Sequence, residues 1–382
     1  MIEYIIVIVL VIVIFQLYFK ITSPFWSHQP VTHRHQLFRR LTSPTVIDEE
    51  LYVPKFMNLL NITTEEFNQD EEVNQEEEFN QFICTHYLKN NTIWFNPSFE
   101  KHILPYFRHD TNSYISYYRK EGVLLGVVTN RILRIQLCGK KFAVSYMDLM
   151  CVHQDHRRKL IAPELIQTHE YIQRTKSDKK CKISLFKKEG KLHDFIPLIE
   201  FDIKTYNRKI IKQIIDFPYK LPDHVSCIKI INNSFQDMLA FLTKCSDKYD
   251  CFIVPLLETL IELMEQNTIY IYALIEREQI IAAYFFRENA TYMNSSKQNL
   301  DCFASLNNSP NINTFILGFN VAIGKIMSKF NMLQLENIGD NNYIYEDLER
   351  RNISPTYNIQ SAYYIYNYSS NSIDITKAFI LN

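Results

Sequence analysis

Glycine is scarce in this sequence, and its scarcity excludes two large classes of nucleotide-binding fold. The 382 residues include only 7 glycines. Dinucleotide-binding folds and P-loop folds both need closely spaced glycines, because backbone amides must come close to the phosphates. No two glycines of this chain have either spacing. Any phosphate-bearing ligand must therefore be held in another way.

The length of 382 residues suggests two domains rather than one, and the composition indicates a globular protein. Hydrophobic residues make up 47% of the chain, which is enough for a sizeable core. The net charge is -1, so there is no broad basic surface and nucleic acid is not an expected partner. The 8 cysteines are scattered without a C-x-x-C pair, which favours reduced thiols. No metal site is expected.

The N-terminus differs from the rest of the chain. Residues 4–15 are uninterrupted apolar, and the run continues to Phe19 with only Gln16 inside it. That length is near the minimum of about 17 residues for a membrane-spanning helix. A cleaved signal peptide is the alternative, but Glu3 before the run and Lys20 after it fit poorly. We expect residues 1–20 to be a single-pass transmembrane anchor. Because basic residues follow the run and none precedes it, the globular part should face the cytosol.

Periodicity predicts an α/β fold with a mixed (α+β) sheet. After the anchor, four apolar runs have strand character: Tyr114–Arg119, Val123–Thr129, Arg131–Leu137 and Phe142–Met150. A helix is expected from Pro163 to about Arg174. The second part of the chain predicts helices around Phe235–Leu242, Leu256–Glu265 and Phe315–Phe330, a hairpin of Ile269–Glu276 with Gln279–Phe286, and a strand at Tyr363–Tyr368.

The segment from Asp148 to Ile166 carries the clearest chemical signal. It predicts a strand, then a basic loop with Arg157, Arg158 and Lys159, then the start of a helix. Unpaired amides and the positive end of the helix dipole suit a pyrophosphate at this place. The alternative is an ordinary helix start with solvated basic residues. The local pattern alone leaves both interpretations open.

This segment resembles a signature of the protein N-myristoyltransferases, N-F-L-C-V-H-x-x-x-R-S-K-R-L-A-P-x-L-I. Asp148 stands where that signature has Asn, and Arg158-Lys159-Leu160 stand where it has S-K-R. Residues 25–31 resemble the family's F-W-x-T-Q-P-V. Residues 364–368 resemble its Y-L-Y-N-W, and Ala378–Asn382 resemble its closing G-L-V-L-Q. The likeness covers nearly everything after the apolar run.

The resemblance implies two fused acetyltransferase-like (GNAT) halves related by a pseudo-two-fold axis. Residues 21–205 would form the acyl-CoA half. Residues 206–382 would form the half that binds peptide and supplies the base. The implied activity is transfer of a myristoyl group from myristoyl-CoA to the N-terminal glycine amine of protein substrates. Myristoyl-CoA would be a co-substrate, with no permanently bound cofactor, and the chain would be a monomer.

The resemblance also implies roles for individual residues. Backbone amides of Leu149 and Met150 would form the oxyanion hole, and the terminal carboxylate of Asn382 would be the general base. CoA would be bound by Phe25, Trp26, Leu149, Met150, Cys151, Val152, Arg157, Arg158, Lys159, Leu160, Ile161 and Ala162.

The peptide-binding side departs from the family's pattern. An acidic loop of type Y-V-E-D-x-D is replaced by residues 87–91, Y-L-K-N-N. The long segment that follows the signature helix in the family is also missing here. Two alternatives therefore stay open: a catalytically silent protein that binds acyl-CoA or acyl-peptide, and an acyltransferase with another acceptor, such as lysine.

Overall fold

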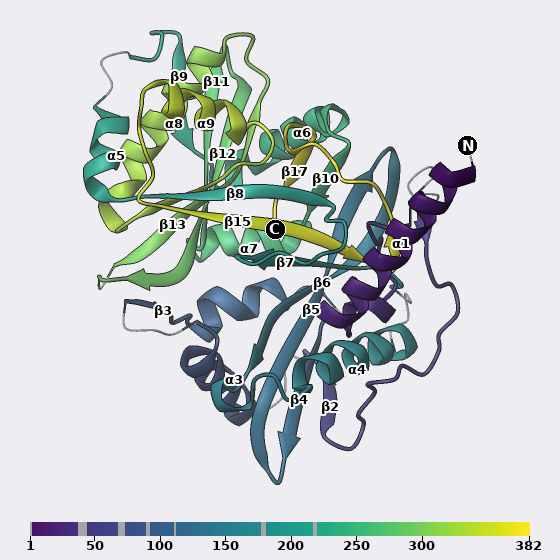
Figure 1. Ribbon diagram of the computed structural model, residues 1–382. Helices are drawn as coiled ribbons and strands as arrows, with labels where there is room; N and C mark the ends of the chain where they lie inside the picture. Colours follow the sequence, from purple (N-terminus) through teal and green to yellow (C-terminus); the bar gives the residue numbers. More distant parts are fainter. Residues whose placement is uncertain are drawn as a thin grey trace.

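The computed structural model shows a large mixed sheet with helices on its faces (Figure 1). The structure describes residues 2–36, 44–67, 73–88, 92–110, 112–176, 181–216, 220–295 and 297–382. Residues 89–91 of the loop noted above lie outside these ranges.

The helices are α1 (Ile2–Thr22), α3 (Val73–His86), α4 (Ile161–Lys176), α5 (Arg208–Ile215), α6 (Phe235–Cys245), α7 (Leu257–Glu265), α8 (Ile312–Ile326) and α9 (Asn341–Arg350). The strands are β1 (Thr45–Val46), β2 (Ile62–Glu66), β3 (Ile93–Phe95), β4 (Tyr114–Lys120), β5 (Val123–Leu137), β6 (Lys140–Val152), β7 (Ser184–Glu189), β8 (Ile199–Tyr206), β9 (Val225–Lys229), β10 (Cys251–Val254), β11 (Ile269–Glu276), β12 (Gln279–Met293), β13 (Gln298–Asn307), β14 (Leu333–Glu336), β15 (Tyr357–Tyr366), β16 (Tyr368–Ser369) and β17 (Ala378–Ile380).

One continuous sheet connects the first and second parts of the chain. Its main path runs β17-β10-β5-β6-β7-β15-β8-β14-β13-β12-β11-β9. Strand β15 lies between β7 and β8, although both come much earlier in the chain. Strand β3 pairs with β12, so an early segment also extends the later sheet. Figure 1 shows β8, β15 and β7 crossing the middle of the molecule, with the C-terminus among them.

Most predicted elements are confirmed because their local patterns are strong. The hairpin of β11 and β12 turns at Arg277 and Glu278, which have φ values of 49° and 65°. Positive φ at both central residues gives the twist that a two-residue hairpin needs. Helix α4 begins two residues before the predicted Pro163 and ends two residues after Arg174.

The predicted break at Asn130 is wrong, since β5 continues through it from Val123 to Leu137. Asn130 is fully buried, and its side chain is satisfied inside the fold. Its Oδ1 accepts hydrogen bonds from the Tyr114 amide at 3.1 Å and contacts His169 at 2.9 Å, while its Nδ2 donates to Asn112. A buried polar residue with such partners does not interrupt a strand.

Two apolar clusters cover opposite faces of the β11–β13 region. Helices α5, α8 and α9 pack on one face, with Phe315 and Phe319 fully buried there. Helices α6 and α7 pack on the other, together with Phe379 and Leu381 of the C-terminal segment. The C-terminal segment is therefore part of the core.

The expected transmembrane anchor is wrong. Among the residues that the structure describes, no helix combines the length and apolar character needed to cross a bilayer. The predictions of a single-pass membrane location and of a cytosol-facing catalytic part depended on this anchor and are wrong as well. The end of α1 instead packs on the domain: Phe19 is only 3% exposed and contacts the cluster that contains Val31, Phe195 and Tyr364.

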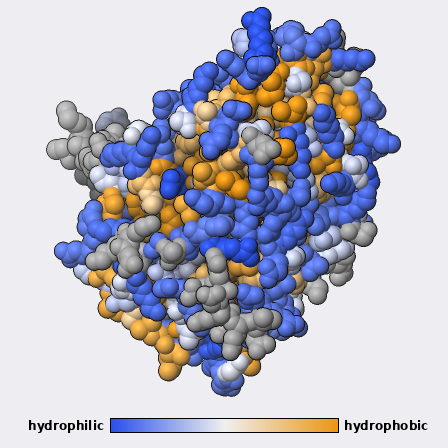
Figure 2. Space-filling model, turned by 180° about the vertical axis from the view of Figure 1, so that it is seen from behind, coloured by the Kyte–Doolittle hydropathy of each residue, from blue (hydrophilic) through white to orange (hydrophobic). Residues whose placement is uncertain are grey.

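Seen from the opposite side, the surface is largely hydrophilic with apolar areas between (Figure 2). Exposed large apolar residues occur on α1, for example Leu10 and Ile14, and elsewhere, for example Ile228 and Ile312. Apolar atoms form a substantial part of any protein surface, so scattered residues of this kind need no special cause.

Candidate active site

The predicted oxyanion residues lie in a β-bulge of β6. Val127 pairs with Cys151 and Thr129 pairs with Asp148, so Leu149 and Met150 together face the single residue Val128. Leu149 has φ 45°, which is unusual for a residue other than glycine. Bulges turn backbone groups out of the ladder and are frequent next to active sites. Here the Leu149 amide donates to Oδ1 of Asp148 at 2.8 Å.

The sequence ends inside the molecule. Asn382 is only 7% exposed, and Phe379, Ile380 and Leu381 are buried before it. Strand β17 runs parallel to β10, which in turn pairs with β5. The Leu381 amide donates to the Ile253 carbonyl at 2.9 Å and extends this pairing. The structure therefore brings Asn382 close to β5, the strand whose Val128 lies opposite the bulge.

Two arginines hold Asn382. Nη1 of Arg287 donates to the main-chain oxygen of Asn382 at 2.6 Å. Nη2 of Arg131 donates to the side-chain oxygen of Asn382 and also lies 3.7 Å from Oδ2 of Asp148. Asp148, Arg131 and Asn382 thus form a continuous polar path from the bulge to the end of the sequence.

The path continues into the second part of the chain. Arg287 lies 3.4 Å from Asp301, and Asn289 donates to the same carboxylate at 2.6 Å. Burial raises the pKa of Asp301 to about 6, although Arg287 opposes this. Nearby, Lys187 of β7 pairs with Glu336 of β14 at 2.9 Å. Charged groups from β5, β6, β7, β12, β13 and β14 therefore converge where the sheet joins the two parts.

The basic loop before α4 contains one braced arginine and two solvent-facing basic residues. Arg157 donates from Nε to the Val152 carbonyl at 3.2 Å and from Nη2 to the His86 carbonyl at 2.7 Å. Arg158 and Lys159 are exposed, and within the described part of the chain neither side chain has a polar partner. Arg158 and Leu160 both have φ 64°, so the loop turns sharply into the helix.

The start of α4 packs very closely against β5. A Cβ added at Gly126 would lie 2.8 Å from Cδ1 of Leu165 and 3.1 Å from Cγ2 of Ile161. Only a residue without a side chain allows this approach. Ile161 is buried here, Ala162 is half-buried and Leu160 is exposed.

The Phe25–Val31 segment is fixed against α4 and β15. Gln29 is buried, and its Oε1 accepts hydrogen bonds from Gln167 at 3.1 Å and from Tyr366 at 2.9 Å. Trp26 stacks on Phe186, with ring centroids 5.6 Å apart, and Phe25 packs edge-on against Trp26 at 5.0 Å. The structure therefore ties this segment to α4 through Gln29, while Trp26 packs on Phe186 of β7.

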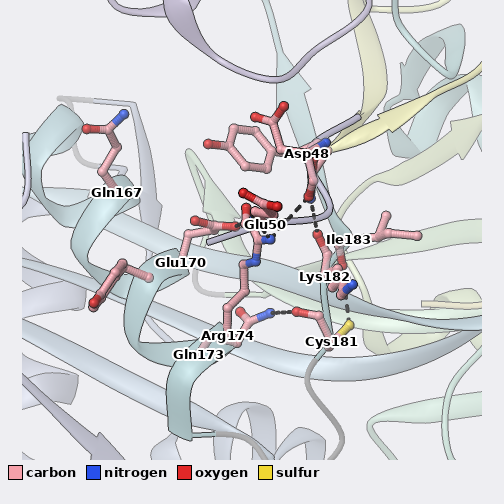
Figure 3. A network of polar contacts seen from close by, with 12 residues as sticks. Asp48, Glu50, Gln167, Glu170, Gln173, Arg174, Cys181, Lys182 and Ile183 are labelled. Carbon is pink, nitrogen blue, oxygen red and sulfur yellow. Dashed lines mark hydrogen bonds and ion pairs between the residues drawn. The ribbon is translucent and has the colours of Figure 1, made fainter. Parts of the chain in front are cut away.

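The opposite end of α4 is held by the polar network of Figure 3. Arg174 donates to the carbonyls of Asp48 and Glu50, each at 3.2 Å, and lies 3.3 Å from Glu170. Gln173 donates to the Cys181 carbonyl at 3.4 Å. Because both ends are tied down, α4 is a rigid support for the loop that precedes it.

Cys151 is structural in character rather than nucleophilic. It is 4% exposed, and burial raises the pKa of its thiol to about 12. Since the thiolate is the reactive form, this side chain is inert near neutral pH. The neighbouring Val152 is half-buried and packs beside Ile161 and Leu165.

Leu149 borders an aromatic cluster that lies between α3 and β4–β6. The cluster contains Phe79, Phe82, Ile83, Ile103, Phe107, Ile115, Tyr117, Leu124, Val127 and Cys151, with Phe67, Phe95, Phe99, Tyr106 and Leu149 packed against it. A single π-helical turn, Phe99–Ile103, contributes to it. Such turns are often found at functional sites.

Sequence reasoning missed three residues of this site: Asp148, Arg131 and Arg287. Each is a charged residue within or directly after a predicted strand, which is the signal that the sequence offered. Charged groups at such positions are buried only when they are paired. Which groups pair across the sheet could not be deduced from spacing.

The architecture is that of a protein built from acetyltransferase-like halves. Solved structures of the Saccharomyces cerevisiae N-myristoyltransferase with bound myristoyl-CoA have this fold. One shares 13% identity with a TM-score of 0.72, covering 93% of this chain and 90% of that one. Another shares 12% identity with a TM-score of 0.68, covering 92% and 94%. A third, with myristoyl-CoA and inhibitors, shares 14% identity with a TM-score of 0.71, covering 92% and 91%. The chain therefore has the N-myristoyltransferase fold, as the sequence predicts. No family profile and no curated protein matches it by sequence.

Proposed function

We propose that this protein transfers a myristoyl group from myristoyl-CoA to the N-terminal glycine amine of protein substrates. The observation that supports this best is the short polar path between the Leu149–Met150 bulge and Asn382. An acyl transfer needs donors for the developing oxyanion and a base for the amine at opposite sides of one thioester. The fold shared with proteins solved with myristoyl-CoA supports the choice of acyl donor.

In this proposal residues 21–205 bind acyl-CoA and residues 206–382 bind the peptide. The exposed side chains of Arg158 and Lys159 and the start of α4 bind the phosphates of CoA, with the Arg157 brace holding the loop in place. Phe25, Trp26, Cys151, Val152, Leu160, Ile161 and Ala162 complete the CoA site. The acyl chain enters the aromatic cluster that Leu149 borders.

The reaction balances with groups that this chain supplies. The substrate ammonium loses one proton to the α-carboxylate of Asn382, when Asn382 is the last residue of the protein. The free amine attacks the thioester carbon while the amides of Leu149 and Met150 stabilise the oxyanion. The carbon–sulfur bond then breaks, the second proton of the nitrogen passes to the CoA thiolate, and the carboxyl group of Asn382 releases the first proton to solvent.

One observation favours a second candidate, a catalytically silent acyl-CoA-binding protein. The Leu149 amide already donates to the Asp148 carboxylate, and a negative charge beside an oxyanion site opposes the formation of an oxyanion. An active enzyme must move that carboxylate off the amide when the thioester binds.

Incubation with labelled myristoyl-CoA and a library of glycine-initiated peptides separates the candidates. Alanine-initiated versions of the same peptides are the matched controls. The proposed function requires label on the glycine peptides and release of an equal amount of free CoA. Tight binding of myristoyl-CoA without any labelled peptide would establish the silent candidate instead.

A further inference from the structure

Arg287 of β12 lies between Asn382 and Asp301 and contacts both. Its Nη1 donates to the main-chain oxygen of Asn382 at 2.6 Å, and its Nη2 lies 3.4 Å from Oδ2 of Asp301. The guanidinium packs over the ring of Phe303 at 4.7 Å, which helps to hold it in this place. The side chain of Asp301 is only 10% exposed, so water screens its charge poorly. The two groups therefore share one cation.

This arrangement affects how well the terminal carboxylate can act as a base. An α-carboxyl group has a low ordinary pKa of about 3.3–3.7, and a cation beside it favours the ionised form and makes it a weaker base. If Arg287 acted on Asn382 alone, its whole charge would weaken the base. The negative charge of Asp301 on the other nitrogen of the same guanidinium offsets part of that effect.

Other groups around this pair keep one charge state near neutral pH. Burial lowers the pKa of Lys187, but Glu336 raises it well above its ordinary value, and burial raises the pKa of Tyr363 to about 12. Asp301 differs, because burial raises its pKa to about 6. The further polar groups that face Asp301, Arg287 or Asn382 are Glu336, Asn289, Tyr106 and Arg131, with Asp148 behind Arg131.

We propose that Asp301, acting through Arg287, keeps the terminal carboxylate of Asn382 basic enough to accept a proton from the substrate ammonium. This inference rests on the proposed function, with Asn382 as the last residue, and adds to it a positioning residue in the second part of the chain. Asp301 itself takes no part in the proton transfer. When Asp301 is protonated, the full charge of Arg287 falls on the carboxylate, and acylation becomes slower.

The test compares acylation rates over a range of pH. Single-turnover rates are measured with saturating myristoyl-CoA and glycine-initiated peptide from about pH 5 to about pH 8, in the full chain and in Asp301→Asn. The readout is the ratio of the native rate to the variant rate at each pH. Titration of the substrate amine affects both proteins equally and cancels in this ratio. Asp301→Glu keeps the charge, and Asp237→Asn removes an exposed charge on α6 as a control.

We expect the ratio to be close to 1 at about pH 5, where Asp301 is mostly protonated, and to rise with a midpoint near 6. At about pH 8 it should reach about 3–10, because a change of about one pKa unit in a base changes the rate by up to about tenfold. Asp301→Glu should keep the native profile, and Asp237→Asn should give a constant ratio. If Asp301→Asn does not fold, Asp301→Ser provides the same comparison. A ratio that does not change with pH overturns the inference.

The sign of the change separates this role from a purely structural one. Ionisation of the buried Asp301 costs stability, so the native protein loses stability relative to Asp301→Asn as the pH rises. Rates that only followed the stability of the fold would make the ratio fall with rising pH, whereas the proposal makes it rise. A falling ratio therefore also overturns the inference.

A second readout does not need turnover. The carboxyl carbon of Asn382 is labelled with ¹³C, and its NMR signal is followed over the same pH range in the native protein and in Asp301→Asn. Because Arg287 connects the two groups, the native signal should move with a midpoint near 6, and the variant signal should not. A native signal that stays constant through this midpoint overturns the inference.

The two ideas fail in different ways. If the native protein acylates glycine peptides but the ratio is independent of pH, the role of Asp301 is wrong and the proposed function stands. If the native protein acylates none of these peptides, the proposed function is wrong and the inference is overturned with it, whatever the signal of Asn382 shows.

Discussion

Arg287 of β12 and Asn382 meet through a 2.6 Å hydrogen bond to the Asn382 main-chain oxygen. Burial alone would lower the pKa of Arg287, but neighbouring Tyr106 and Asp301 raise it, so its charge is retained. A permanent cation from the second part of the chain therefore fixes the residue that we propose as base.

A single glycine added after Asn382 should abolish most of the activity. The addition converts the carboxylate into an amide and moves the nearest carboxylate by about 3.5 Å. General-base catalysis contributes about 10²–10⁴-fold, so the acylation rate should fall by that factor. Single-turnover kinetics measures the rate, and calorimetry should show almost unchanged binding of acyl-CoA. Asn382→Gln is the control that keeps the carboxylate in place. Native rates in the extended protein would show that the base lies elsewhere.

We expect two residues of the basic loop, Arg158 and Lys159, to bind acyl-CoA, and a third, Arg157, to hold the loop in place. Arg158→Ala and Lys159→Ala should each weaken acyl-CoA binding by about 5–30-fold, because each loses a contact between charged groups. Arg157→Ala should instead lower the thermal midpoint, since Arg157 holds the loop to Val152 and His86.

Fluorescence titration and thermal unfolding of the three variants check this division. Lys244→Ala, which removes an exposed lysine on α6, is the control for general charge effects. Equal acyl-CoA affinity in all four variants would mean that the loop is only a solvated helix start.

Gly126→Ala should destabilise the protein and displace the start of α4. The added methyl group would lie 2.8 Å from Leu165, and such overpacking costs about 1–3 kcal/mol. The cost should be smaller in a Leu165→Ala background, where the methyl group has space. A double-mutant cycle by chemical denaturation measures this coupling. Strictly additive effects would contradict the close contact.

Asp301 should make the stability depend on pH below neutrality. Its pKa is raised by burial from 3.8 to about 6 in the folded state, so the folded protein binds more protons than the unfolded chain between these values. Stability from this group is fully present below about pH 4 and is lost as the pH rises through 6. The shift of about two units corresponds to about 3 kcal/mol.

The comparison of native protein with Asp301→Asn isolates that group. The difference between their free energies of unfolding should change by about 3 kcal/mol between pH 4 and pH 7, with the native protein losing stability relative to the variant. Urea titrations at four pH values measure it. A difference that stays constant with pH would show that Asp301 keeps an ordinary pKa.

The local elements could be predicted because their causes are local. The β11–β12 hairpin follows from two apolar runs around Arg277 and Glu278, and α4 follows from a proline near its start and an apolar stripe. The bulge at Leu149 was not predicted, and only the resemblance singled out the amides of Leu149 and Met150. Nothing in the strand's own pattern requires an extra residue there.

Long-range partners could not be predicted. Asn130 has the residue type of a turn, yet its buried partners Tyr114 and His169 keep it within a strand. The apolar run at the N-terminus is only near the minimum length for an anchor. Run length also says nothing about the packing of Phe19 on the cluster that contains Val31 and Tyr364. The roles of Arg131 and Arg287 could not be predicted, because their partner Asn382 reaches them only through the pairing of β17 in the sheet.

The place of β15 in the sheet bears on how the chain is made. Strands β7 and β8 are complete at Tyr206, but β15, which lies between them, begins at Tyr357. Ribosomes add about 5–20 residues per second, so these two edges wait roughly 8–30 s for their partner. Unpaired edges of that kind invite pairing with other chains. During that interval the nascent protein is therefore a natural client for a chaperone that shields open sheet edges, and a chain that stops before residue 357 would need such protection for as long as it persists.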